Sequence, residues 1–192
     1  MISWISSRTS ESGPFLFLDR DGVVNVDRAE SVRTWDDFEF YPDALESLRW
    51  LRERGLRVIL VSNQSALNRG WMTWGDFWDI HRRMIAGVRE AGGDLLAAFY
   101  CPHRPDESCC CRKPAPGQLL AASRIFGVPL ESTYMIGNRL SDAKAAASAG
   151  CRIVLLDRAD SVTGRGERTG DEATPPHLRY SLLSEAVTSL FS

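Results

Sequence analysis

At residues 15–22 the chain reads Phe15-Leu16-Phe17-Leu18-Asp19-Arg20-Asp21-Gly22. A short apolar run that ends in a polar turn is typical of a buried strand. Alternate residues of an extended segment point to the same side, so Asp19 and Asp21 are expected to face one pocket. One carboxylate can then act as a nucleophile and the other as a general acid and base. The alternative is a solvated turn, because Asp and Gly are common turn residues.

Further short apolar runs alternate with helical patterns along the chain. The predicted strands cover residues 58–61, 96–100, 133–136 and 152–156, and the predicted helices cover residues 42–55, 73–92, 116–127, 141–149 and 184–191. Strands that alternate with helices favour parallel pairing with right-handed crossovers. The sequence therefore predicts an α/β fold around a mostly parallel sheet.

Length and composition indicate a globular protein. The chain has 192 residues, of which 44% are hydrophobic and 25% are charged, and its formal net charge is -2. That balance gives no support to a broad nucleic-acid or membrane-surface role. No apolar run reaches the roughly 20 residues of a membrane span, and no signal peptide is evident. We expect a monomeric cytoplasmic protein with an N-terminal tail at 1–13, a single domain at 14–192 and a mobile loop at 158–177.

Polar clusters also follow the other predicted strands. Ser62-Asn63 follows the second strand, Arg112-Lys113 lies beyond the third, and residues 137–142 follow the fourth. Because ligands bind at the carboxyl ends of the strands in such sheets, these clusters predict one active site. A hydroxyl, backbone N–H groups and the lysine charge could hold a phosphate, and acidic residues could hold Mg²⁺. Taken one by one, the same residues could be helix caps or solvated charges.

Four of the five cysteines lie within residues 101–111. Their spacing supplies three thiolates and, with one histidine, the composition of a structural tetrahedral zinc site. The predicted zinc ligands are Cys101, His103, Cys109 and Cys111. This closed set leaves no open position for catalysis, so the zinc would fold the loop of residues 101–116 and leave Cys110 as a bystander. A disulfide or free thiols are the alternative.

Together these motifs resemble those of haloacid dehalogenase superfamily phosphatases. The chain carries the superfamily's motifs in order, within about residues 15–157, as Asp19-Arg20-Asp21-Gly22-Val23, Ser62-Asn63, Lys113 and Gly137-Asn138-x-x-x-Asp142. The similarity is greatest to the branch of D-glycero-D-manno-heptose 1,7-bisphosphate phosphatases and histidinol phosphatases. Segments that resemble this branch occur at residues 19–25, 63–65, 101–103 and 109–114. The resemblance implies a three-layer Rossmann-like fold with no large cap and a zinc-stabilised loop.

The resemblance also implies a role for each motif. Asp19 would be the nucleophile that forms an aspartyl-phosphate, and Asp21 would be the general acid and base. The transferring phosphate would be held by Ser62, Asn63 and Lys113. Other parts of the substrate would contact Arg69, Arg112 and Arg139. Mg²⁺ would be held by the Asp19 carboxylate, the Asp21 backbone carbonyl and the residue at position 138.

Position 138 departs from the family pattern, in which an aspartate is usual. The amide oxygen of Asn138 can ligate Mg²⁺ but brings no charge. Three interpretations stay open: Asp142 shifts in as a ligand, the chain is a natural enzyme with weaker Mg²⁺ affinity, or it is an inactive variant, natural or engineered. We expect weakened rather than absent metal binding, because Asp19 and Asp21 remain.

For the substrate, the sequence favours D-glycero-D-manno-heptose 1,7-bisphosphate, cleaved at C7. Residues 25–27, 38–40 and 69–70 resemble the heptose group. The alternative is histidinol phosphate, because the five-residue gap between His103 and Cys109 resembles histidinol phosphatases. A zinc-stabilised binding module without catalysis is a hypothesis from another class, and only the missing charge at position 138 supports it.

Overall fold

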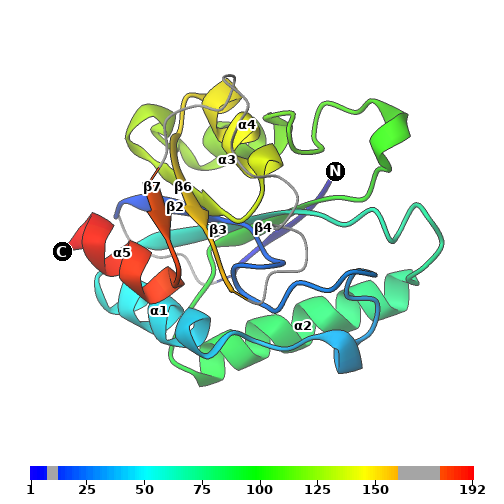
Figure 1. The fold of residues 1–192 in the computed structure, drawn as a ribbon, viewed down its shortest axis with the longest axis horizontal. Helices are drawn as coiled ribbons and strands as arrows, with labels where there is room; N and C mark the ends of the chain where they lie inside the picture. The colour runs from blue at the N-terminus through cyan, green and yellow to red at the C-terminus, as the bar shows by residue number, and fades with distance from the viewer. Residues whose placement is uncertain (8–12, 160–177) are drawn as a thin grey trace.

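The computed structural model describes residues 1–7, 13–159 and 178–192. Within them the centre of the fold is a sheet of seven strands in the order β1-β4-β3-β2-β5-β6-β7 (Figure 1). The strands are β1 Ile2–Ile5, β2 Phe15–Leu18, β3 Arg57–Asn63, β4 Ala97–Cys101, β5 Tyr134–Gly137, β6 Arg152–Leu156 and β7 Leu178–Tyr180. Neighbours pair in parallel except β1, which is antiparallel to β4. The predicted mostly parallel sheet is confirmed.

Helices cover both faces of this sheet, as Figure 1 shows, so the predicted three layers are confirmed. One face carries α1 Pro42–Glu53, α2 Trp74–Glu90 and α5 Leu183–Phe191, and the other carries α3 Gly117–Phe126 and α4 Leu140–Ala149. Short 3-10 turns lie at η1 Trp35–Asp37, η2 Pro105–Glu107 and η3 Leu130–Ser132. None of the helices in the described ranges is long and apolar enough to cross a membrane.

The central strand β2 explains where the first acidic motif lies. Leu16 and Leu18 pack into the core under α1, α2 and α5, whereas Phe15 and Phe17 pack under α3 and α4. All four residues are buried, as expected for a strand with helices on both faces. Because β2 pairs with β3 and β5, the residue after it, Asp19, emerges at the middle of the sheet's carboxyl edge.

Both edges of the sheet differ from the prediction. Residues 1–13 were expected to form a tail, but Ile2–Ile5 forms β1 and pairs with β4 from Ile2 opposite Tyr100 to Ile5 opposite Ala97. The four residues alternate between half-buried and exposed, which is typical of a short edge strand and gives little hydrophobic signal. The strand β7 has only three residues and was also not predicted. From residue 160 onward, the loop predicted at 158–177 lies outside the described residues.

The β1 edge buries a histidine on α2. The Nδ1 atom of His81 lies 2.8 Å from the Tyr100 hydroxyl, and its ring packs edge-on against Trp4 and Trp78. Its Nε2 atom has no hydrogen-bond partner in the part of the chain that the structure describes. Burial lowers the pKa of His81 to about 4, and the charge of Arg20 adds to the effect. The folded protein therefore keeps this histidine neutral.

We expect this histidine to make the fold sensitive to acid. Below pH 6.5 the unfolded chain protonates His81, whereas the folded chain does not until the pH nears about 4. Stability is therefore lost as the pH falls, by about 2 kcal/mol between pH 7 and pH 5 from this residue alone. Urea denaturation should show that His81→Gln removes this part of the pH dependence. An equal loss in the variant and the natural protein would contradict the assignment.

Candidate active site

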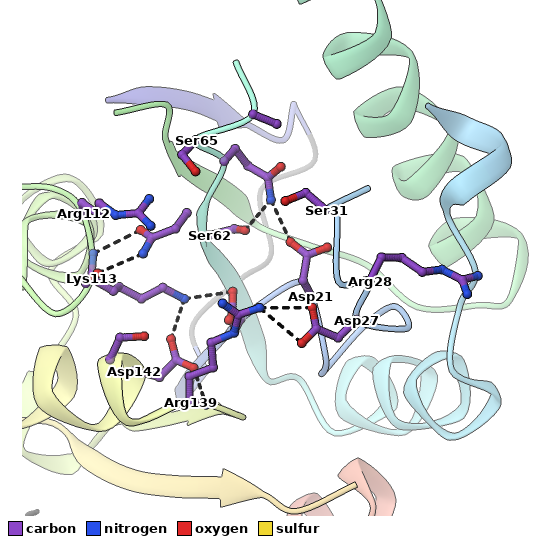
Figure 2. A pocket seen from close by; sticks show the side chains of 15 residues that line it. Asp21, Asp27, Arg28, Ser31, Ser62, Ser65, Arg112, Lys113, Arg139 and Asp142 are labelled. Carbon is purple, nitrogen blue, oxygen red and sulfur yellow. Dashed lines mark hydrogen bonds and ion pairs between the residues drawn. The ribbon is translucent and has the colours of Figure 1, made fainter. Parts of the chain in front are cut away.

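The polar residues at the strand ends line one cavity of about 760 Å³, a volume that includes its open mouth. Figure 2 shows Arg112 and Lys113 on one side of it and Asp21 and Asp27 on the other. The lining consists of Asp19, Asp21, Asp27, Arg28, Ser31, Ser62, Asn63, Gln64, Ser65, Ala66, Arg112, Lys113, Arg139, Ser141 and Asp142. The structure therefore brings together all four sequence motifs, as the topology of a parallel sheet predicts.

A buried lysine lies between two carboxylates on the cavity floor. The Nζ atom of Lys113 is 2.9 Å from Asp19 Oδ1 and 2.7 Å from Asp142 Oδ1, and it donates a hydrogen bond to the Val61 carbonyl. Burial raises the pKa of Asp19 to about 7, although the Lys113 charge opposes the rise. Burial lowers the pKa of Lys113, but the two carboxylates outweigh this effect and raise it. The lysine thus stays charged and can neutralise an anion bound beside Asp19.

The second carboxylate of the motif is held from three sides. Asp21 Oδ1 accepts hydrogen bonds from Arg20 Nη2 at 2.9 Å and Asn25 Nδ2 at 3.0 Å, and Oδ2 accepts one from Gln64 Nε2 at 2.8 Å. Gln64 also donates to Ser62 Oγ and accepts from Arg20. Burial favours the neutral acid, but the Arg20 charge and these hydrogen bonds hold the pKa of Asp21 below its usual range. The arrangement stabilises the carboxylate and fixes its position.

The Asn63 side chain is committed to the lysine segment. Its Nδ2 donates to the Lys113 carbonyl at 3.0 Å, and its Oδ1 accepts from the Lys113 backbone N–H at 3.1 Å. Gln118 Nε2 also donates to Asn63 Oδ1. In this structure the Asn63 side-chain amide therefore positions Lys113, and the contact of Asn63 with the phosphate stays a prediction. The Ser62 hydroxyl, which accepts from Gln64, can still donate its hydrogen to a phosphate oxygen.

Two of the three predicted substrate arginines line the cavity. Arg112 donates to the His103 carbonyl at 3.1 Å, and Arg139 Nη2 lies 3.1 and 3.2 Å from the two carboxylate oxygens of Asp27. Arg69 is exposed and is not part of the lining. The contact of Arg69 with substrate therefore stays a prediction, whereas Arg112 and Arg139 lie where a ligand in the cavity could reach them.

Sequence reasoning assigned no role to several residues that shape the cavity. Arg20, Asn25 and Gln64 hold Asp21, and a signal was present, because all three belong to the motif segments that mark this phosphatase branch. Arg28 and Ser31 line the cavity from a loop without periodic pattern, so the sequence carried no signal for them. In Figure 2 the guanidinium of Arg28 extends away from the centre of the cavity.

The environment of position 138 fits a cation ligand. Both side-chain polar atoms of Asn138 are buried, and neither has a hydrogen-bond partner in the described ranges. A Cβ atom built on Gly22 would lie 2.0 Å from Asn138 Nδ2, so the amide sits directly against the turn that follows Asp21. A buried amide oxygen without a partner is costly unless a ligand satisfies it. With the oxygen atoms of Asp19 and Asp21, it gives the hard donor set that Mg²⁺ prefers.

Asp142 does not take the place of the missing charge in this structure. Its Oδ2 accepts from the backbone N–H groups of Asn138 and Arg139, at 3.1 and 3.0 Å, at the start of α4. Its Oδ1 pairs with Lys113. Because both oxygens are engaged, the interpretation in which Asp142 shifts in as a metal ligand finds no support in the observed geometry.

The cysteine-rich loop gathers its predicted ligands into one cluster. The donor atoms of Cys101, His103, Cys109 and Cys111 all lie within 4.8 Å of one another. Cys101 Sγ lies 3.6 Å from Cys109 Sγ and 3.4 Å from Cys111 Sγ. Those separations exceed the S–S bond of about 2.05 Å and approach the edge of about 3.8 Å of a tetrahedron with Zn–S bonds of about 2.3 Å. The geometry indicates a metal site and no disulfide, and Cys110 is exposed.

Comparison with known proteins identifies the family of this chain. Over residues 4–150 the chain matches the hydrolase family described as haloacid dehalogenase-like hydrolase. The chain belongs to this family. It is 36% identical over 160 residues to a D-glycero-beta-D-manno-heptose-1,7-bisphosphate 7-phosphatase of Pseudomonas putida, a match that covers 83% of this chain and 89% of that relative. A relative of the same name from Bordetella bronchiseptica is 38% identical over 154 residues, covering 80% and 83%.

A solved structure shows the same similarity for this haloacid dehalogenase-like hydrolase. The crystal structure of D,D-heptose 1,7-bisphosphate phosphatase from B. bronchiseptica, complexed with magnesium and phosphate, has a TM-score of 0.86 at 33% identity. The match covers 93% of this chain and 98% of that chain. A Mesorhizobium loti protein of HAD-like fold has a TM-score of 0.76 at 27% identity, covering 98% of this chain and 90% of that chain. The resemblance that the motifs indicated is thus confirmed at the level of family and fold.

Proposed function

We propose that this chain is a D-glycero-D-manno-heptose 1,7-bisphosphate 7-phosphatase. The observation that carries the proposal is the Lys113 ammonium, which is buried beside Asp19 at the floor of the cavity with Asp21 on the same motif. That arrangement supplies a nucleophile, a neutralising charge and an acid–base group for phosphoryl transfer. The relatives that share the site's family carry this name at 36% and 38% identity.

Within this proposal each carboxylate of the acidic motif has its own task. Asp19 Oδ1 accepts from Lys113 and from the Arg20 backbone N–H, so Oδ2 is the oxygen that attacks phosphorus in line. Because its pKa is low, Asp21 is a carboxylate before the substrate binds, so the proton that it passes to the departing C7 oxygen would enter with the monoanionic form of the substrate's phosphate. Arg20 stabilises the carboxylate that is regenerated. Asp21 then takes a proton from the water that hydrolyses the aspartyl-phosphate. Lys113 balances the charge of the transferring group throughout.

Two metal sites are part of the proposal. Asp19, the Asp21 carbonyl and Asn138 would hold Mg²⁺, which supplies charge neutralisation at the phosphoryl group. The B. bronchiseptica neighbour, complexed with magnesium and phosphate, supports this assignment. The Cys101, His103, Cys109 and Cys111 cluster would hold a structural Zn²⁺, since its composition matches a closed tetrahedral site.

Two observations support the proposed substrate, namely the arginines in the cavity lining and the name that the similar proteins carry. Arg112 and Arg139 line it, and a bisphosphate offers a second anionic group for them to contact. We expect phosphate release from the beta anomer of heptose 1,7-bisphosphate with Mg²⁺ to exceed release from the alpha anomer and from histidinol phosphate. Faster release from histidinol phosphate would replace the proposed substrate with that alternative.

The cysteine cluster also bears on the cellular location. A cluster of reduced thiols that binds metal suits a reducing compartment, and we therefore propose a cytoplasmic location. The monomeric state and the absence of nucleic-acid and membrane partners stay predictions.

The amide at position 138 leads to a prediction about Mg²⁺ affinity. Asn138→Asp adds one negative charge beside the donor oxygens of Asp19 and Asp21, and affinity for hard cations rises with ligand charge. We expect Mg²⁺, measured by calorimetry without substrate, to bind about tenfold more tightly, which equals about 1.4 kcal/mol. Ser31→Asp, which adds the same charge elsewhere in the lining, is the control. Equal affinities for Asn138→Asp and the natural protein would rule out Asn138 as a ligand.

A further inference from the structure

A buried arginine beyond β6 touches the turn that follows the acidic motif. Arg158 Nε donates to the Gly22 carbonyl and Nη2 donates to the Val23 carbonyl, each at 3.3 Å. Its side chain is only 4% exposed. Nothing in the motifs or in the proposed chemistry uses this residue. A buried cation of this kind needs a partner to offset the loss of hydration.

The partner of Arg158 is Asp43 in the first turn of α1. The two groups form a bidentate pair, with Nη1 to Oδ1 at 2.9 Å and Nη2 to Oδ2 at 3.0 Å. The guanidinium carbon also lies 3.7 Å from the centre of the Tyr41 ring. Asp43 Oδ2 in addition accepts from the backbone N–H of Leu183 at the start of α5. The ion pair with Asp43 thus fixes the orientation of the guanidinium plane, and the other N–H groups of Arg158 point to the carbonyls of the turn.

The turn that Arg158 holds is the one that places the candidate catalytic oxygens. Gly22 adopts the left-handed region with φ at 86°, and its N–H donates to the Asn25 carbonyl. Asn138 packs against its α-carbon. A shift of the Gly22 carbonyl would disturb the backbone next to Asp21, which lines the cavity. Small displacements of reacting groups are costly in phosphoryl transfer, where positioning supplies much of the rate.

We propose that Arg158 is a positioning residue that holds the turn after Asp21 in its reactive geometry. The expected effect on rate rests on the proposed phosphatase function. The contacts of Arg158 with the turn do not depend on which sugar phosphate is the substrate. A lysine at this position keeps the charge, yet it lacks the planar fork that binds Asp43 and the two carbonyls together. Arg158→Lys therefore tests the positioning role with less loss of fold stability than a truncation of the side chain would cause.

The test compares Arg158→Lys with Asp43→Asn. Asp43→Asn weakens the ion pair but leaves the donors of Arg158 facing the Gly22 and Val23 carbonyls. The probe is orthovanadate with Mg²⁺, bound in a calorimeter, because five-coordinate vanadate mimics the geometry of phosphoryl transfer. Melting temperatures of both variants are measured in parallel. Arg158→Gln, which keeps amide donors without a charge, is the second variant if Arg158→Lys folds poorly.

We expect Arg158→Lys to weaken vanadate binding about tenfold, which is typical of residues that orient the groups in contact with a ligand. Asp43→Asn should weaken vanadate binding by about twofold at most. With the sugar bisphosphate, Arg158→Lys should lower kcat about tenfold with little change in KM. Vanadate binding that falls in parallel with melting temperature in both variants would overturn the proposal. The protein could also show the expected tenfold and twofold losses of vanadate affinity yet hydrolyse none of the sugar phosphates. That result would support the positioning role of Arg158 and refute the proposed substrate.

Discussion

Asp19→Asn is expected to lower phosphate release by roughly 10⁴-fold or more, because an amide cannot form the aspartyl-phosphate. The fold should tolerate the change well. Asp19 Oδ1 shares the Lys113 ammonium with Asp142, so an Asn amide oxygen leaves that charge paired on its other side. The measurement is release of inorganic phosphate from the heptose bisphosphate under saturating Mg²⁺, alongside a melting curve.

The matched control for this prediction is Asp94→Asn. Asp94 pairs with Arg89 at 3.3 Å and does not line the cavity, so its variant undergoes the same change of residue and loses a partly exposed ion pair without touching the site. We expect Asp94→Asn to release phosphate at the natural rate. Residual activity above about one hundredth in Asp19→Asn would be inconsistent with a nucleophilic role for this carboxylate.

Removal of one cysteine of the metal cluster is expected to have the second largest effect. Cys111→Ser replaces a thiolate with a hydroxyl, a much weaker zinc ligand, and the loop of residues 101–116 has little core of its own. Because Lys113 follows two residues later, the loss of loop order should remove the lysine from Asp19 as well. We expect one zinc per natural chain, less than a tenth of that in the variant, and a melting temperature lower by about 10 °C.

Cys110→Ser is the control for the zinc prediction, because Cys110 is exposed and lies in the same loop outside the cluster. It should keep one zinc, the natural melting temperature and full activity. Metal content is measured by mass spectrometry after gel filtration. A natural protein that contains no zinc, or a Cys111→Ser variant that keeps it, would refute the closed Cys₃His site.

The fold could be predicted where burial dominates the pattern. Leu16, Leu18 and Phe17 form a strand that is covered on both faces, and such strands give uninterrupted apolar runs. The N-terminal strand was missed for the opposite reason. Ile2–Ile5 is half-exposed, pairs only with β4, and gains its stability from that tertiary contact rather than from local pattern.

In the candidate site, some residues could be placed from the sequence and others could not. Asp19, Asp21 and Lys113 could be placed from the sequence, because residue type and topology together put them at the same sheet edge. The supporting contacts between segments that lie far apart in the sequence could not be predicted. Asn63 holds Lys113 across 50 positions of sequence. Arg158 reaches Gly22 across 136 positions. Such long-range hydrogen bonds depend on side-chain geometry that no local motif encodes.

In the proposed reaction Asp19 removes the C7 phosphate of the heptose bisphosphate and leaves the C1 phosphate in place. Phosphorus-31 NMR can follow the two groups separately, because the C1 and C7 phosphates of the substrate give separate resonances. We predict that the C7 resonance is replaced by inorganic phosphate while the C1 resonance persists, and that Asp19→Asn leaves both unchanged. Loss of the C1 resonance, or no change of either resonance with the natural protein, would refute C7 hydrolysis at Asp19.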